Sequence, residues 1–331
     1  MSRTGEQLTA TEMGKLWASY LGNSMGACTI GYFLKHVDDP DIKKILEFAL
    51  DLSHDFTRTI KKIFEENDFP VPVGFKEEDV NWEAPRLFYD EFYLHYLQYV
   101  GKAGMSIYSV GIPLITNTAI RDFIVHCLHE TTRLMMMVND LLKAKGRLEN
   151  APSVTSPRRI DYVDKQSFLK GYFGDVRPLH GLEVAHLFGC INNDVTSKAL
   201  MLGFLQGAKT EKVKNYFKRG IRLNQKHIDK LSAKLNEDNL PAPSLLDHLV
   251  TPSKIQVFSE KLMMFHKIDM FSMKIREYAN GASLNGRRDI GAMYTKCQID
   301  VSLYVEDGAN IMIDHAWMEQ PPLMIDRGIK K

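Results

Sequence analysis

The chain has 331 residues, of which 44% are hydrophobic and 25% are charged, the proportions of an ordinary globular protein. Its 42 basic and 41 acidic residues leave a net charge of +1, which excludes a polyelectrolyte attraction to nucleic acid or to an anionic membrane. No run approaches about 18 consecutive apolar residues, so we expect no membrane span. The four cysteines are widely spaced and the first residues lack the apolar core of a signal peptide. Together these features predict a cytoplasmic protein with reduced thiols.

The second half of the chain repeats the first. Phe69-Pro70-Val71-Pro72 returns as Leu240-Pro241-Ala242-Pro243, and Glu12 returns as Glu183, in both cases 171 positions later. Cys127 and Cys297 are 170 positions apart, so the register slips by one residue after the Pro-x-Pro segment. The repeat predicts two copies of one fold unit, at 1–148 and 179–331, joined by a linker at 149–178 that contains a short helix.

Each copy is predicted to contain four long helices. In the first copy, Thr9 or Thr11 can cap a helix that runs to about His36, and Pro40 suits the first turn of the next helix. Pro70 and Pro72 prevent that second helix from continuing past about residue 67. The remaining helices are expected at about 85–110 and 118–145 in the first copy, and at 181–207, 210–237, 254–280 and 286–314 in the second.

The lengths of the connections predict how these helices are arranged. The first and second helices of each copy, like the third and fourth, are joined by a few residues, so each pair forms an antiparallel hairpin. About 16 residues (68–84 and 238–253) separate the hairpins, long enough to run the length of a bundle. Two hairpins joined by one long crossover form the ferritin-like topology. Helix 254–280 is apolar almost all round, which predicts packing against the other copy or against a second chain in a homo-oligomer.

Several segments of the chain resemble those of a known family. In chain order they are Leu16-Trp17, Phe33-Leu34-Lys35-His36-Val37, Phe69-Pro70-Val71-Pro72-Val73-Gly74-Phe75, Lys165-Gln166-Ser167-Phe168, Glu260-Lys261-Leu262-Met263-Met264-Phe265-His266 and Glu306-Asp307-Gly308-Ala309-Asn310-Ile311-Met312-Ile313. Over nearly its full length the chain resembles a tandem ferritin-like family, domain of unknown function 3231, that is common in spore-forming bacteria. The resemblance implies the all-α fold of two tandem ferritin-like four-helix bundles. It implies no reaction, because the family carries no established activity.

The second copy is expected to point one ionisable group from each helix toward its centre. At 100° per residue, the inward stripes contain Glu183, His227, Asp269 and Asp300, and His186 lies at the edge of its stripe. The first helix's stripe also contains Asp194. The matching positions in the first copy are Glu12, Phe56, Tyr99 and Glu130, so two of the four are aromatic there.

Facing carboxylates repel one another unless a cation or basic partners neutralise them. Iron or manganese bound by Glu183, His227, Asp269 and Asp300, with His186 nearby, is one solution, and it predicts a metal site inside the second bundle. A hydrogen-bonded polar network is an alternative, and Glu183 alone would also suit a helix N-terminus.

The sequence therefore leaves the function open and identifies no particular reaction. A non-catalytic scaffold or interaction protein, connected with sporulation or stress, is the main alternative to a metal protein. A small-molecule carrier with an apolar slot between the bundles has no residue signature.

Overall fold

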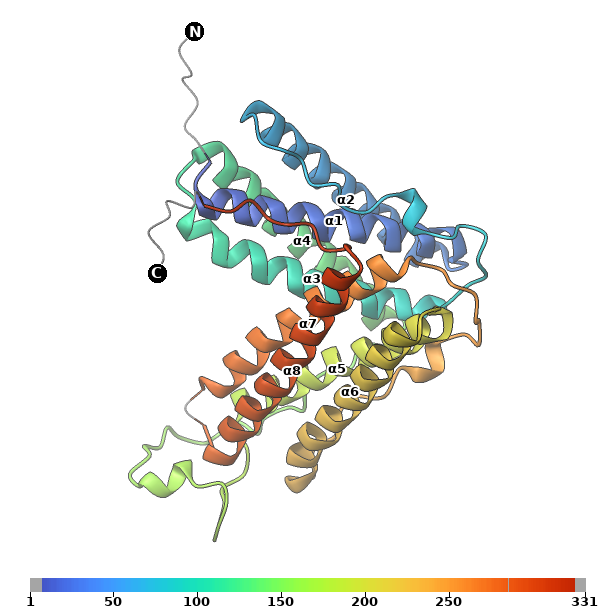
Figure 1. Cartoon of the computed structure of the whole chain (residues 1–331). Helices are drawn as coiled ribbons and strands as arrows, with labels where there is room; N and C mark the ends of the chain where they lie inside the picture. The colour runs from blue at the N-terminus through green and yellow to red at the C-terminus, as the bar shows by residue number, and fades with distance from the viewer. Residues whose placement is uncertain (1–7, 285, 325–331) are drawn as a thin grey trace.

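The computed structural model describes residues 8–284 and 286–324, which form two groups of four helices connected by loops (Figure 1). Residues 1–7 and 325–331, which the predicted domain bounds include, and residue 285 lie outside the described part. The described residues contain the helices α1 (Ala10–His36), α2 (Pro40–Glu66), α3 (Asp90–Gly111), α4 (Thr118–Ala144), α5 (Gly181–Gly207), α6 (Glu211–Glu237), α7 (Glu260–Ala282) and α8 (Arg288–Asp314).

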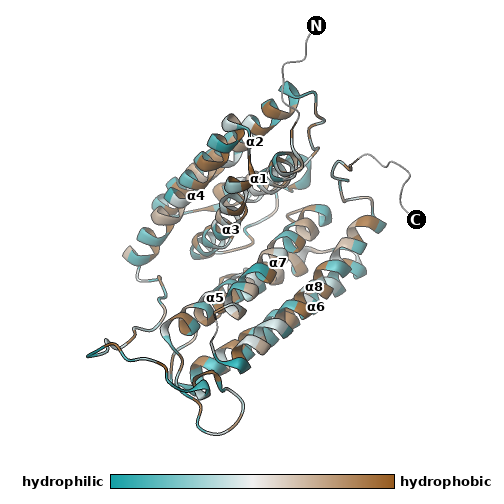
Figure 2. Cartoon of the chain, turned by 90° about the vertical axis from the view of Figure 1, so that its left-hand side faces the viewer, coloured by the Kyte–Doolittle hydropathy of each residue, from teal (hydrophilic) through white to brown (hydrophobic). Residues whose placement is uncertain are grey.

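The all-α fold of two tandem bundles is confirmed. Helices α1 and α2 form one hairpin of the first bundle and α3 and α4 form the other, and α5–α8 repeat this arrangement in the second bundle. Local signals begin the helices as expected, because Thr9 caps α1 through a reciprocal bond with Glu12, and Asp39 caps α2 just before Pro40. Figure 2 shows the two bundles side by side, with hydrophobic and hydrophilic residues alternating along the helices. No described helix is both long and apolar enough to cross a membrane.

The third helix of each bundle begins later than predicted. The sequence predicts it from residue 85 in the first copy and from 254 in the second, whereas α3 begins at Asp90 and α7 at Glu260. The residues in between are not helical, because the two crossover loops bond to each other. Val80 bridges Phe258, and Phe88 bridges Val250, both antiparallel.

These two bridges are related by a pseudo-twofold axis. Val80 and Val250 are equivalent positions 170 residues apart, and so are Phe88 and Phe258, so each bridge is the counterpart of the other. The hydrogen bonds obey the same relation. The N–H of Asn81 donates to the carbonyl of Val257 (2.6 Å), and the N–H of Thr251, equivalent to Asn81, donates to the carbonyl of Leu87 (3.0 Å). The two halves therefore meet as the subunits of a symmetric dimer would.

A reciprocal pair of arms strengthens this contact. Glu149, which follows α4, accepts the N–H of Ser244 in the crossover of the second bundle. Glu319, which follows α8, accepts the N–H groups of Val73 (2.8 Å) and Gly74 (2.7 Å) in the crossover of the first. The segment that carries Glu319 runs back along the first bundle in Figure 1. Each bundle therefore holds the crossover of the other.

Helices α3 and α7 lie at the axis itself. Helix α7 contacts both α1 and α3, and Tyr99 and Ala103 of α3 pack with Met270 and Met273 of α7 in a small buried cluster. The apolar surface that the sequence shows on this helix is thus covered by the other bundle of the same chain.

Candidate functional site

Glu183 is part of the helix capping rather than of the bundle centre. Its side chain, 1% exposed, forms two bonds with the guanidinium of Arg177 (2.8 and 2.9 Å) and accepts the N–H of Arg287 (2.6 Å), next to the start of α8. It also caps α5 by accepting the N–H of His180. Burial would raise the pKa of Glu183, but these bonds outweigh it and lower the pKa. Glu12 makes the equivalent bonds to Thr9 and Asn117.

Two further residues of the predicted site lie away from the others. Asp269 lies on α7 where that helix meets the first bundle, and burial raises the pKa of its carboxyl group. His186 is half-buried in the second turn of α5, and loss of water contact lowers the pKa of its imidazole.

His227 and Asp300 are the two predicted residues that do meet. His227 is fully buried, and its Nε2 lies 3.5 Å from Oδ2 of Asp300. The same oxygen of Asp300 lies 2.7 Å from the ammonium of Lys226, which lowers the pKa of Asp300 against the opposing effect of burial. The predicted convergence of Glu183, His227, Asp269 and Asp300, with His186 nearby, is therefore not found. Within residues 8–284 and 286–324, no three His, Cys, Asp or Glu side chains are placed to hold a metal ion together.

The centre of the second bundle contains an ion pair instead. The Nζ of Lys274 lies 2.6 Å from Oδ1 of Asp194, and both side chains are almost completely buried. Lys274 also donates to Oδ1 of Asn224 (2.6 Å), and the hydroxyl of Tyr278 donates to Oδ2 of Asp194 (2.9 Å). Tyr278 in turn lies 3.1 Å from Nδ1 of His227. The chain of contacts thus runs from Lys274 through His227 to the partly exposed Asp300.

The polar network that the sequence left open as an alternative is therefore present, with a basic partner that the sequence reasoning missed. The inward face of α7 carries four large side chains at helical spacing: Lys267, Phe271, Lys274 and Tyr278. This spacing was visible in the sequence. Lysine is rarely buried, which is why the sequence favours the neighbouring stripe containing Asp269 as the inward one.

Lys267 is a second buried lysine in this core. Its ammonium donates to Oγ of Ser197 (2.8 Å) and lies over the rings of Tyr99 and Phe271. Burial, together with the nearby charge of Lys274, lowers its pKa well below the ordinary value.

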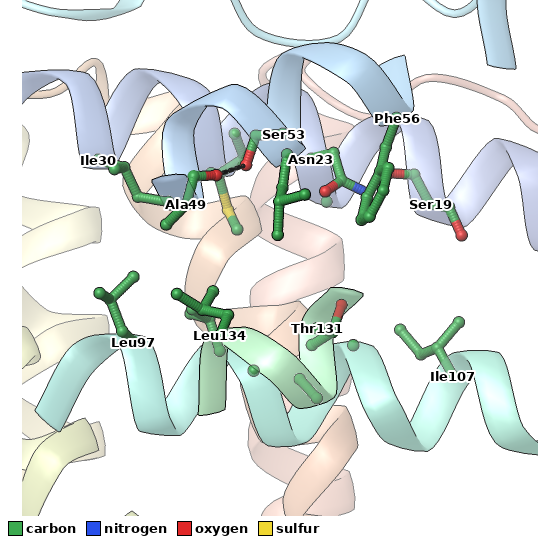
Figure 3. A pocket seen from close by; sticks show the side chains of 18 of the residues that line it. Ser19, Asn23, Ile30, Ala49, Ser53, Phe56, Leu97, Ile107, Thr131 and Leu134 are labelled. Carbon is green, nitrogen blue, oxygen red and sulfur yellow. Dashed lines mark hydrogen bonds between the residues drawn. The ribbon is translucent and has the colours of Figure 1, made fainter. Parts of the chain in front are cut away.

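The first bundle has a cavity of about 110 Å³ where the second bundle has this charged core (Figure 3). Equivalent positions differ in a consistent way. Gly104 replaces Lys274, Leu97 replaces Lys267, and Asn23 replaces Asp194. The lining also includes Ser19, Gly26, Ser53, Phe56, Tyr108, Thr131, Leu134 and, from the second bundle, Asp269 and Met270. The two copies therefore differ at their centres: the second bundle contains charged side chains there, and the first contains a cavity.

Comparison with known proteins gives a family and a distant structural likeness. The family model described as "Protein of unknown function (DUF3231)" matches residues 1–160 and 167–329. No curated protein matches the chain. A crystal structure from Bacillus halodurans, of a protein described as a candidate for the spore coat, is similar with a TM-score of 0.40 and 17% identity. The likeness covers 45% of this chain and 98% of that one. On the match to its two halves, the chain belongs to the DUF3231 family of proteins of unknown function.

Proposed function

We propose that the chain is a non-catalytic helical scaffold or interaction protein. The observation that carries this proposal is that the buried carboxylate at the centre of the second bundle, Asp194, is already neutralised by Lys274. Glu183 and Asp300 likewise have basic partners, Arg177 and Lys226. Two of the three carboxylates that prompted the metal hypothesis, Glu183 and Asp300, therefore have basic partners within the chain.

The ion pair also opposes a metal at the same place. A cation bound to Asp194 would lie beside the ammonium of Lys274, and like charges in a region shielded from water repel strongly. His227 and Asp300 would remain as a two-ligand site, fewer than the three or four protein ligands that hold iron or manganese in carboxylate bundles.

An interaction role is supported by the linker between the bundles. Residues 149–178 contain one short 3₁₀ helix and leave large apolar side chains in water. Ile160, Tyr162 and Phe173 are 81%, 92% and 87% exposed. Long loops with exposed apolar side chains are typical of binding segments. The connection with sporulation or stress remains a prediction from the family resemblance.

Elemental analysis separates the scaffold from the metal protein. We expect protein purified after growth with iron and manganese to contain far less than one ion per chain, and chelator to leave its melting temperature unchanged. Stoichiometric metal that His227→Ala removes, and that the exposed control His54→Ala retains, would overturn the proposal.

Site-specific photo-crosslinking in the source cells tests the interaction role. A photo-reactive amino acid at Tyr162 or Phe173 should give one dominant adduct. The same amino acid at Tyr89, an exposed tyrosine at the start of α3, should give none. Equal labelling at all three positions would contradict a binding function of the linker.

A further inference from the structure

The two bundles can be compared at equivalent positions. Side chains fill the centre of the second bundle, whereas the first bundle has a cavity there. In the second bundle, the side chains of Phe271, Lys274 and Tyr304 fill the centre. The equivalent positions of the first bundle, Gly101, Gly104 and Leu134, line the cavity. The open space therefore includes the place beside Gly104 from which the Lys274 side chain extends in the other copy, whereas the side chain of Met135 fills the place beside Gly101.

The polar groups around the space have changed from charged to neutral. In the second bundle the head group is an ammonium, held by Asp194 and Asn224 and close to Tyr278 through Asp194. The equivalent residues in the first bundle are Asn23, Ser53 and Tyr108, and all three line the cavity. Asn23 donates its amide N–H to the hydroxyl of Tyr108 (3.2 Å) and to the carbonyl of Ser19 (2.8 Å). These neutral groups can form hydrogen bonds with an uncharged head group, but they supply no opposite charge for a charged one.

One polar atom of the lining has no partner. Ser19 is 5% exposed, and its Oγ makes no hydrogen bond within the described residues. A buried hydroxyl without a partner costs free energy, so it is a place where a ligand or an ordered water gains a bond.

From these observations we propose that the cavity of the first bundle binds a small uncharged molecule with an apolar body and one hydroxyl group. A cavity of about 150 Å³ accommodates benzene, so one of about 110 Å³ suits a molecule of about five non-hydrogen atoms, such as a four-carbon alcohol. The apolar body would lie against Gly104, Ile107 and Leu134. The hydroxyl would bond with Ser19 and Asn23. This site is independent of the scaffold role.

The carboxyl group of Asp269 would favour a different class of ligand, one with a positive charge. It is the charged residue among those described that line the cavity, and it enters from the second bundle. If it selected the ligand, a protonated amine would bind in place of an alcohol. The comparison of equivalent residues in the two bundles favours the alcohol, since the polar groups that the first bundle itself contributes carry no charge.

The test is a titration of the full chain with 1-butanol, followed by the methyl NMR signals of Ile30, Ile107 and Leu134. We expect saturable shifts in these cavity residues, with a dissociation constant on the order of a millimolar. The methyl groups of Leu187 and Ile228 in the second bundle should not shift. Absence of saturable shifts at the cavity methyl groups, which is the result expected if the cavity holds water only, would overturn the proposal.

Two variants sharpen the result. A Cβ added at Gly26 or Gly104 meets cavity side chains at ordinary contact distances of 3.4 Å or more. Gly26→Ala/Gly104→Ala should therefore fold and bind 1-butanol at least about tenfold more weakly, because the two methyl groups occupy the site. Gly14→Ala is the matched control, since Gly14 is exposed in α1 and its added Cβ meets nothing within 4 Å. Unchanged binding by the double variant would place the ligand elsewhere.

Ser19→Ala and a charged probe test the head group. Ser19→Ala removes a buried hydroxyl that has no partner, so the variant should fold while its affinity for 1-butanol falls about threefold to tenfold. n-Butylamine should bind more weakly than 1-butanol. Tighter binding of the amine that Asp269→Asn abolishes would overturn the assignment of an uncharged ligand.

Discussion

The hydroxyl of Tyr96 and Nε2 of His266 lie 2.9 Å apart, although the two residues occupy the same position in the two copies of the repeat. They face each other across the pseudo-twofold axis between α3 and α7. Both side chains are fully buried. Burial, with the charge of the adjacent Lys267, lowers the pKa of His266 to about 3. The histidine is therefore neutral at the interface over the whole physiological range.

This buried imidazole makes stability depend on pH. Between the unfolded pKa of about 6.5 and the folded pKa of about 3, the unfolded chain binds a proton that the native chain excludes. The free energy of unfolding is therefore not reduced by His266 above about pH 6.5. It falls as the pH is lowered, and this residue reduces it by about 2 kcal/mol at pH 5. In urea unfolding at pH 7 and pH 5, His266→Gln should shrink the difference between the two stabilities by about that amount. The exposed His54→Gln should leave it unchanged, and an equal effect of both variants would contradict the assignment.

The pair of Asp194 and Lys274 should be strongly coupled. Lys274→Met leaves a buried carboxylate without its partner and should cost about 3 to 5 kcal/mol in the free energy of unfolding. Asp194→Asn/Lys274→Met removes both charges and keeps an acceptor for Tyr278, so it should be more stable than the single Lys274→Met variant. A double-mutant cycle by urea denaturation measures the coupling. The surface pair of Glu211 and Lys214 is the control, where the coupling should be much weaker. Additive effects at the buried pair would contradict its role.

Glu183 should stabilise the folded chain whether or not a metal is present. Glu183→Ala removes the bonds that connect the starts of α5 and α8 and leaves Arg177 without its carboxylate partner, so it should cost about 3 kcal/mol. Glu12→Ala should cost less, because Glu12 has no basic partner in the described structure. The low pKa of Glu183 means that its contribution is present at neutral pH and is lost as the pH falls through that pKa. Unfolding curves with and without chelator should coincide for both variants, and a cost that appears with metal alone would restore the metal hypothesis.

The contact between α5 and the second crossover should not tolerate a methyl group. A Cβ at Gly207 would lie 2.9 Å from Cα of Gln256 and 3.0 Å from the carbonyl oxygen of Ile255, both of which are backbone atoms. Gly207→Ala should therefore cost about 2 kcal/mol and displace the crossover. Hydrogen exchange of the Asn81 amide, which bonds to Val257, should become faster. Gly14→Ala should leave that exchange rate unchanged, so acceleration by both would indicate a general loss of stability instead.

The architecture could be predicted from the sequence because its signals are local. Pro40, Pro70 and Gly146 mark where helices begin or end, and the repeat doubles each signal. The starts of α3 and α7 could not be predicted in the same way. Residues 85–89 and 254–259 are compatible with a helix. They are not helical because they bond to the other crossover, which is a contact between distant parts of the chain.

The candidate site was predicted less well, for a physical reason. The sequence identified correctly that the second copy buries charge, and His227 and Asp300 do meet. Helical phase alone cannot tell which of two neighbouring stripes of α7 faces inward when one contains Lys274 and the other Asp269. The interface with the first bundle decides this, since it takes the face with Asp269 and leaves Lys274 for the core. The cavity could not be predicted either, since small residues indicate space only after the opposing helices are placed.

Because the two bundles belong to one chain, the residues that meet at the pseudo-twofold axis need not be identical. In a dimer of identical chains, every residue on a twofold axis meets its own copy, so a tyrosine can face only a tyrosine there. A single chain that carries both halves can place Tyr96 against His266, and it can fill the centre of one half with charged side chains while the other half has a cavity. Tandem fusion thus allows the two halves to specialise without losing the symmetric surface by which they recognise each other.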